Sequence, residues 1–115
     1  MITAQHDQIY HHLQKHISLR DEEWENIQSV LQERTVNRKE YLLKAGQPCT
    51  AIYYVNRGAL RAFYQTPEGK EATIMFAIAD WWITDMPCFV NQSAAMISIE
   101  AIEESKVLVL TKNDL

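Results

Sequence analysis

The chain has 115 residues, of which 47% are hydrophobic and 23% are charged, so its composition is that of a globular protein with room for one domain. Its formal net charge of −4 argues against a surface that binds a nucleic-acid backbone, because such binding needs a basic face. The sequence shows neither a membrane-spanning apolar run nor a signal peptide, so we expect a cytoplasmic protein in which Cys49 and Cys88 are reduced thiols.

Two helices are predicted at the N-terminus. Over residues 3–17, Ile9, Leu13 and Ile17 recur every four positions, while polar residues occupy the other faces. Ser18 is predicted to cap a second helix, because three acidic residues at 21–23 follow it and the first turn of a helix favours negative charge. The apolar face of this helix consists of Trp24, Ile27 and Leu31, and we expect the helix to end near Gln32–Arg34.

From Thr35 onward the hydrophobic pattern changes from helical to strand-like. The chain's three glycines, Gly46, Gly58 and Gly69, fall in turns between short apolar segments, a spacing that predicts an antiparallel sandwich or barrel. The predicted strands are Thr35–Val36, Tyr41–Leu43, Ile52–Val55, Ala59–Tyr64, Ala72–Ile78, Ile97–Ile102 and Lys106–Leu110.

The segment Ala72–Ile78 is apolar on both of its faces. Ala72, Ile74, Phe76 and Ile78 alternate with Thr73, Met75 and Ala77, so we expect this strand to be covered on both sides. At the end of the chain, Thr111 and Asp114 resemble a capping box that opens a third helix. We therefore expect the sequence to be part of a longer protein.

Catalytic and metal-binding patterns are weak. All four histidines (His6, His11, His12 and His16) precede the first predicted strand, so a cluster of metal ligands inside the barrel is not expected. His12 and His16 have the spacing of a metal-binding pair, although an exposed polar helix face is the favoured interpretation. There is no nucleophile motif, and a Cys–His pair has no local signature. We predict neither an enzyme nor a metal site.

The segment Asp80–Ser93 has the strongest features of a binding site. Asp85 and Pro87 suit the start of a short helix, whose unpaired backbone N–H groups are able to meet a ligand. The sequence leaves two roles open for Asp85, as an N-cap or as a ligand contact. In the adjacent pair Trp81-Trp82, one ring is expected to point inward and the other outward.

Residues 27–115 resemble the sensory domain of the Crp/Fnr transcription regulators, which has the cyclic-nucleotide-binding fold. The family signature is an apolar pair followed by x-x-G-x-x-x-x-x-[IL]-Y-x-[IV]-x-x-G-x-[LV]. It is matched by Leu42-Leu43, Gly46, Ile52-Tyr53-Tyr54-Val55 and Gly58-Ala59-Leu60, and Glu68-Gly69-Lys70-Glu71 matches the family's D/E-G-K/R-E turn. The resemblance implies N-terminal helices over residues 1–34 and a mainly β jelly roll, or double-stranded β-helix, over residues 35–115.

The ligand motif departs from that of nucleotide-binding members. These members carry G-E-[LI], whose Glu holds the ribose, and then R-[ST]-A, whose Arg pairs with the cyclic phosphate. Here Thr84-Asp85-Met86 aligns with the first motif, and Ala94-Ala95-Met96 aligns with the second without an arginine. A buried phosphate without a cationic partner is costly, so we predict a degenerate pocket that binds cAMP and cGMP no more tightly than about millimolar.

We predict no cofactor, since Cys49 and Cys88 do not match the cysteine cluster of the family's iron–sulfur branch. An effector of another kind, uncharged or rich in hydroxyl groups, would suit Asp85 better than an anion. The predicted pocket consists of Thr84, Asp85, Met86, Ile74, Met75, Ala95 and Met96.

In the family, a long dimerisation helix and a helix-turn-helix follow the sensory barrel. The resemblance therefore implies that this chain is the sensor of a bacterial regulator with an unidentified small-molecule effector. The longer protein is expected to be a homodimer that binds DNA through a C-terminal domain, and this chain alone to be monomeric or weakly associating. A stand-alone β-barrel interaction module with a vestigial pocket is the alternative, and a cupin-type enzyme ranks third because no histidine lies in a strand.

Overall fold

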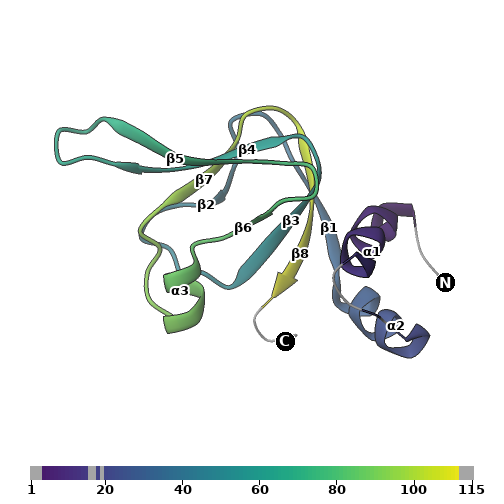
Figure 1. The fold of residues 1–115 in the computed structure, drawn as a ribbon. Coiled ribbons are helices and arrows are strands. Elements are labelled where there is room, and N and C mark those ends of the chain that lie inside the picture. Colours follow the sequence, from purple (N-terminus) through teal and green to yellow (C-terminus); the bar gives the residue numbers. More distant parts are fainter. Residues whose placement is uncertain (1–3, 16–17, 19, 112–115) are drawn as a thin grey trace.

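The computed structural model describes residues 4–15, 18 and 20–111 as two layers of β-sheet with a pair of helices beside one layer (Figure 1). In chain order the elements are η1 (Ala4–His6), α1 (Asp7–Gln14), α2 (Asp21–Val30), β1 (Gln32–Val36), β2 (Tyr41–Leu43), β3 (Ala51–Arg57), β4 (Ala59–Gln65), β5 (Glu71–Ile78), β6 (Trp82–Ile83), α3 (Met86–Asn91), β7 (Ser98–Ala101) and β8 (Ser105–Thr111).

The strands form two antiparallel four-stranded sheets, ordered β1-β8-β3-β6 and β2-β7-β4-β5. Apart from the β4–β5 hairpin, strands that follow one another in sequence lie in different sheets, which is the arrangement of a jelly roll. The predicted mainly β jelly roll with N-terminal helices is confirmed.

The N-terminal helices differ in detail from the prediction. Within the described residues α1 is shorter than 3–17, and the predicted contribution of Ile17 lies outside them. The N-cap of α2 is Arg20 rather than Ser18, because the Glu23 carboxylate reaches back to accept a hydrogen bond of 3.0 Å from the Arg20 backbone N–H. The three acidic residues do occupy the first turn.

Strand β1 begins at Gln32, earlier than the predicted Thr35. Every β1 side chain before Val36 is exposed, so the segment has no alternating apolar pattern that would mark it as a strand. Backbone pairing with β8, from Gln32 opposite Val109 to Val36 opposite Ser105, forms the strand instead. β8 itself runs to Thr111, and the helix predicted to begin there lies outside the described residues.

Gly58 forms the corner between β3 in one sheet and β4 in the other, with the positive φ (+103°) that glycine tolerates best. A Cβ at this position would collide with Ser105, whose Cα would lie 2.6 Å away. Gly69 also has a positive φ, of +83°, and its N–H donates to the Thr66 carbonyl at 2.9 Å in the β4–β5 turn. No atom lies within 4 Å of a Cβ built on Gly69.

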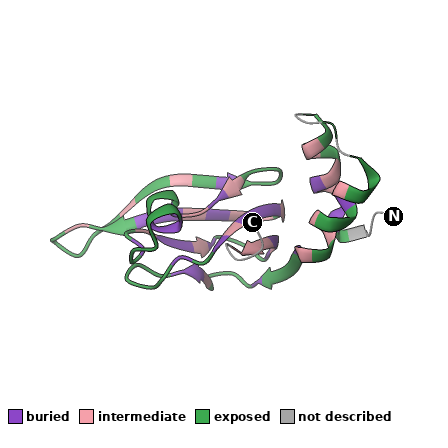
Figure 2. Ribbon diagram, turned by 90° about the horizontal axis from the view of Figure 1, so that it is seen from below, coloured by how far each residue is buried: buried purple, intermediate pink, exposed green. Residues whose placement is uncertain are grey.

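Two clusters of buried side chains hold the layers together. The larger lies between the sheets, and the smaller joins α1 and α2 to the outer face of the sheet that contains β3 and β8. The smaller cluster is centred on Ile9, Trp24, Leu31, Tyr54 and Leu108. Buried residues gather in the middle of the strands and on the inner side of the helices, whereas the tip of the β4–β5 hairpin is exposed (Figure 2).

Strand β5 is not covered on both sides, contrary to the prediction. Ala77 is buried, but Ile74, Phe76 and Ile78 are each more than half exposed. A bulge also disturbs the alternation, because Met75 faces Ala62 while Thr73 faces Phe63, which leaves Ile74 without an opposite residue. Thr73 therefore joins the outer face, where its hydroxyl accepts a hydrogen bond from Arg61.

Candidate functional site

Asp85 caps helix α3 and holds the loop that follows the helix. Its Oδ1 accepts a hydrogen bond from the Cys88 backbone N–H at 3.2 Å, and its Oδ2 accepts from the N–H groups of Met96 at 2.8 Å and Ile97 at 3.3 Å. The residue is only 4% exposed. Of the two roles left open by the sequence, the structure shows the N-cap, and both carboxylate oxygens are engaged by backbone donors of the same chain.

Thr84 is also tied to the barrel. Its hydroxyl donates to the Ala51 carbonyl at 2.8 Å and lies 3.4 Å from the Cys49 sulfur. Ala51 opens β3, so the two residues that align with the family's ribose-binding motif are both fastened to backbone or to the adjoining loop. Their polar groups serve first to position α3.

A cavity of about 280 Å³ adjoins this segment. Three of the predicted site residues, Met75, Thr84 and Met86, line it together with Ile52, Trp82 and Ile83, which the sequence analysis did not include. None of these six residues is charged. The cavity thus has an apolar wall, with the Thr84 hydroxyl as its polar group.

The other predicted site residues do not line this cavity. Asp85 and Ala95 are buried, and Ile74 is exposed at the β5 bulge. Met96, 78% exposed, lines a different cavity of about 410 Å³ with residues that include Tyr41, Lys44 and Phe63. The structure therefore brings together only part of the predicted set.

Arg61 has its charge satisfied away from this cavity. Its guanidinium contacts the Glu71 carboxylate at 2.7 Å and the Glu100 carboxylate at 2.8 Å, and it lies 4.1 Å from the centre of the Phe63 ring. The hydrogen bonds that Arg61 donates to Glu71, and then those to Glu100, raise the pKa of Arg61 above its ordinary value. Because two carboxylates already balance the charge of this arginine, it is poorly placed to compensate a bound phosphate.

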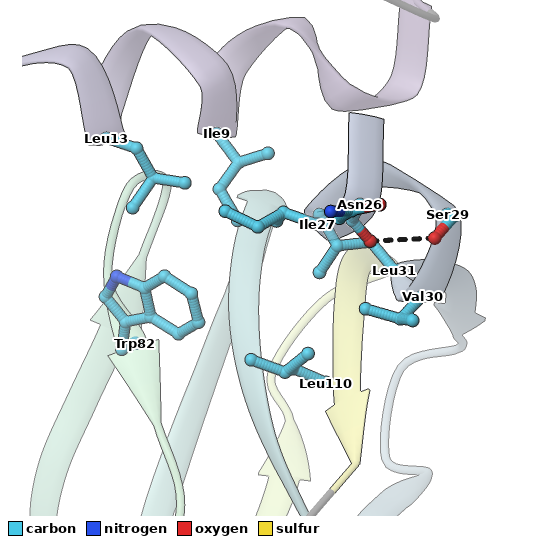
Figure 3. Close-up of a pocket in the computed structure, with 9 residues that line it drawn as sticks. All are labelled: Ile9, Leu13, Asn26, Ile27, Ser29, Val30, Leu31, Trp82 and Leu110. Atoms are coloured by element: carbon cyan, nitrogen blue, oxygen red, sulfur yellow. Dashed lines mark hydrogen bonds between the residues drawn. The ribbon is translucent and has the colours of Figure 1, made fainter. Parts of the chain in front are cut away.

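A larger cavity of about 530 Å³ lies between the helices and the sheet. Figure 3 shows apolar side chains converging on it from α1, α2 and the sheet, with Ser29 donating to the Asn26 carbonyl at 2.7 Å on one side. Its lining consists of Ile9, Leu13, Asn26, Ile27, Ser29, Val30, Leu31, Trp82 and Leu110. Trp82 lines both this cavity and the smaller one, while Trp81 is 48% exposed, as the in-and-out prediction for the pair requires.

A polar tether joins α1 to the turn before β6. The Tyr54 hydroxyl donates to the Asp80 carboxylate, which also accepts from Gln8 Nε2 at 2.9 Å. Burial first, and then Asp80, raises the pKa of Tyr54. The hydrogen bonds from Tyr54 and Gln8 lower the pKa of Asp80, whose backbone adopts a positive φ of +72°.

The described histidines do not gather into a metal site. His6 packs edge-on against Trp24, and His11 lies 3.3 Å from Asp7 on α1. His16, half of the candidate metal pair, is outside the described residues. Across the described part of the chain, no group of three or more His, Cys, Asp or Glu side chains is placed to hold a metal ion. Nor does any helix there have the length and apolarity needed to cross a membrane.

Known proteins with solved structures share this fold. The chain superimposes on DNR from Pseudomonas aeruginosa with a TM-score of 0.81 and 18% identity, covering 99% of this chain and 50% of that one. The catabolite activator protein of Thermus thermophilus gives a TM-score of 0.74 and 24% identity, covering 84% of this chain and 45% of that one.

Sequence comparison points the same way. A curated relative, the anaerobic regulatory protein of Bacillus subtilis (strain 168), is 24% identical over 92 residues, which are 80% of this chain and 39% of the relative. The chain thus spans about two-fifths of that relative's length. Residues 33–115 match the cyclic nucleotide-binding domain family. The chain therefore belongs to the cyclic nucleotide-binding domain family, and its predicted resemblance to the Crp/Fnr regulators is confirmed.

Proposed function

We propose that this chain is the effector-sensing domain of a bacterial transcription regulator and that its pocket does not take a cyclic nucleotide. The fold, the family match and a relative named as a regulatory protein support a sensory role. A regulatory role also favours a cytoplasmic protein without catalytic activity of its own.

The engagement of Asp85 carries the proposal about the pocket. A carboxylate that receives three backbone hydrogen bonds while 4% exposed has little capacity left for a ribose hydroxyl. Turning it toward a ligand would leave the buried Cys88 N–H without its partner, at a cost of about 1–3 kcal/mol, and would also break the bonds from the partly buried N–H groups of Met96 and Ile97. None of the described residues that line the adjacent cavity is charged, so a cyclic phosphate would be desolvated there without compensation.

An apolar, uncharged effector fits this site better than a hydroxyl-rich one. The cavity of about 280 Å³ lies at the lower end of small-molecule sites, which are typically about 300–1,000 Å³. Its polar group, the Thr84 hydroxyl, already donates its proton to Ala51 and keeps acceptor capacity for one donor on a ligand. We therefore favour a compact apolar molecule with at most one hydrogen-bond donor.

Trp82 would transmit ligand binding in the smaller cavity to helices α1 and α2. Because its side chain lines both cavities, a ligand that moves the ring also changes the packing surface of α1 and α2. Regulation would then be a shift between two packings of these elements. In the longer protein, which we propose to be a DNA-binding homodimer, that shift would reach the DNA-binding domain.

A thermal-shift screen tests the ligand proposal, because a compound that binds only the folded chain raises its melting temperature. We expect compact apolar compounds to shift the wild type, and cAMP and cGMP to leave it unchanged. Met75→Gln, which changes the cavity wall, should abolish the shift. Val90→Gln is the matched control, because Val90 is 61% exposed on α3 and does not line the cavity. A shift retained in Met75→Gln would place the ligand elsewhere.

The regulatory assignment has a separate test. The reading frame after Leu115 should encode a long amphipathic helix and a helix-turn-helix, and a stop codon there would support the stand-alone module. Light scattering should show a monomer for residues 1–115 and a dimer for the longer protein. DNA binding by residues 1–115 alone would contradict the proposal that these residues sense the effector while a separate domain binds DNA.

A further inference from the structure

The larger cavity, between the N-terminal helices and the sheet, has the size and the lining of a small-molecule site. Its volume of about 530 Å³ lies within the range of about 300–1,000 Å³ that such sites occupy. Ile9 and Leu31 in its lining are buried, whereas Leu13, Ile27 and Trp82 are only partly buried. Protein interiors are close-packed, so the apolar atoms around this space lack contacts that a bound molecule would supply.

The polar side chains of the lining lie together on α2. Asn26 and Ser29 are both exposed, and Figure 3 shows them side by side at one end of the cavity, where the Ser29 hydroxyl donates to the Asn26 carbonyl at 2.7 Å. The Ser29 oxygen keeps capacity to accept a hydrogen bond, and the Asn26 side-chain amide offers both donors and an acceptor. This arrangement suits a ligand with an apolar body and one polar group.

The charges near the cavity select against an anionic ligand. None of the described residues that line it is charged. On α2, Glu22 lies one turn before Asn26 and Glu25 lies one turn before Ser29, so the neighbouring helix surface is acidic. Arg20 lies 3.4 Å from Glu22 but is outside the cavity lining. An anionic group would be repelled by this surface and desolvated without a cationic partner.

We propose that this cavity is a second ligand site, which binds an uncharged amphipathic molecule with an alkyl or aromatic body and one amide or hydroxyl group. The apolar body displaces water from the partly buried walls, and the polar group pairs with Asn26 and Ser29. The cavity shares only Trp82 with the described lining of the smaller cavity beside α3. Binding here therefore does not depend on an effector in that smaller cavity.

A molecule in this cavity would join elements that are far apart in sequence. The lining includes Leu13 of α1, Ile27 of α2 and Leu110 of β8, so one ligand touches both helices and the sheet. The N-terminal helices are held to the sheet mainly by apolar contacts around the same cavity. The ligand therefore stabilises the docked position of these helices.

Fluorescence titration of the 115-residue chain with N-phenyl-1-naphthylamine, an uncharged probe that brightens in apolar surroundings, tests the proposal. We expect saturable binding of the probe. Decanamide should displace it at concentrations at least about tenfold lower than decanoate, because the carboxylate of decanoate lacks a cationic partner there. Decanamide should also raise the melting temperature of the chain. Absence of saturable probe binding, or equal displacement by decanoate, would overturn the proposal.

Two substitutions in the lining locate the site. Val30→Trp fills the cavity with an apolar ring, and Ile27→Gln places a polar group in its wall. Each should weaken probe binding by at least about tenfold in a chain whose far-UV circular dichroism is unchanged. Ile78→Gln is the matched control, because Ile78 is 53% exposed on β5 and does not line this cavity. It should bind the probe as the wild type does.

Met75→Gln separates this site from the smaller cavity, whose wall it changes. The probe should bind this variant normally, even where the thermal shift by compact apolar compounds is lost. Probe binding that persists in folded Val30→Trp and Ile27→Gln, or that disappears in Met75→Gln, would contradict the assigned site. If Ile27→Gln does not fold, Val30→Trp decides the test, because it adds apolar surface and no polar group.

Discussion

Trp82 lines two cavities that are built in different ways. On the side of α3, the wall is fastened by hydrogen bonds from backbone N–H groups to Asp85 and from Thr84 to the Ala51 carbonyl. On the side of α1 and α2, the wall is mostly apolar packing, with the Tyr54–Asp80–Gln8 tether as a polar contact between the helices and the barrel. The first cavity is shaped by directional bonds and the second by non-directional contacts.

This difference predicts how each region responds to change. Directional bonds to a buried carboxylate define one geometry, and breaking them is expensive because the carboxylate and the Cys88 N–H remain buried. Apolar contacts between helix and sheet tolerate small shifts, since repacked side chains still exclude water. We therefore expect the α3 side to be the more rigid one and the helix side to adjust.

The largest expected effect is at Asp85. Asp85→Ala leaves three backbone N–H groups without their acceptor, and we expect the free energy of unfolding to fall by about 3–5 kcal/mol. Urea denaturation followed by Trp fluorescence measures the loss. Glu68→Ala, in the exposed β4–β5 turn, is the control and should be nearly neutral. A loss below about 1 kcal/mol in Asp85→Ala would mean that these bonds do not hold the α3 wall.

Substitutions at Gly58, which lines neither cavity, show how large a loss of stability a steric collision in the barrel causes. Gly58→Ala forces a side chain into a positive φ and against Ser105, so we expect a loss of about 2–4 kcal/mol. In Gly69→Ala the new Cβ meets no atom within 4 Å, so only the strain of the positive φ lowers the free energy of unfolding, by about 1 kcal/mol. The difference between the two midpoints in urea isolates the collision with Ser105. Equal losses would show that the corner relaxes freely.

The smallest expected effect is at the helix tether, and it depends on pH. Because the Asp80 pKa is lower in the folded chain, the ionised carboxylate stabilises the fold above its unfolded pKa of about 3.9, and this contribution is lost as the pH falls through the lowered folded value. At pH 7 the free energy of unfolding of the wild type should exceed that of Asp80→Asn by less than about 1 kcal/mol, because Asp80 is exposed to solvent.

Asn is the matched substitution at this position, because it also tolerates the positive φ of Asp80. Urea denaturation at several pH values should show the difference between wild type and Asp80→Asn shrinking below about pH 4. A difference that grows on acidification would contradict the assigned direction of the pKa shift. In a Tyr54→Phe background the difference that Asp80→Asn makes should become smaller without vanishing, because the Tyr54 hydrogen bond to Asp80 is lost while that from Gln8 remains.

Local signals were sufficient for much of the fold. Gly58 and Gly69 marked their turns because the backbone there needs a positive φ, which is a property of the residue itself. The start of β1 at Gln32 was missed because its exposed side chains carry no pattern and only pairing with β8 makes it a strand. The outer face of β5 was misjudged because apolar residues in sequence do not reveal whether a second layer covers them.

The site was predicted less completely, because it depends on contacts between distant segments. Asp85 was recognised as a cap or a ligand contact, but its bonds to the Met96 and Ile97 N–H groups come from a loop beyond α3. Ile52 and Trp82 enter the cavity wall through the pairing of β3 with β6.

Isothermal titration calorimetry of the folded chain with cAMP tests the central claim most directly. Because Asp85 is engaged by backbone donors and the described lining of the adjacent cavity carries no charge, we expect no saturable heat below about millimolar cAMP. cGMP should behave alike, because it presents the same phosphate. A dissociation constant in the micromolar range would contradict the account, since Asp85 or an unrecognised cation would then have to serve the nucleotide.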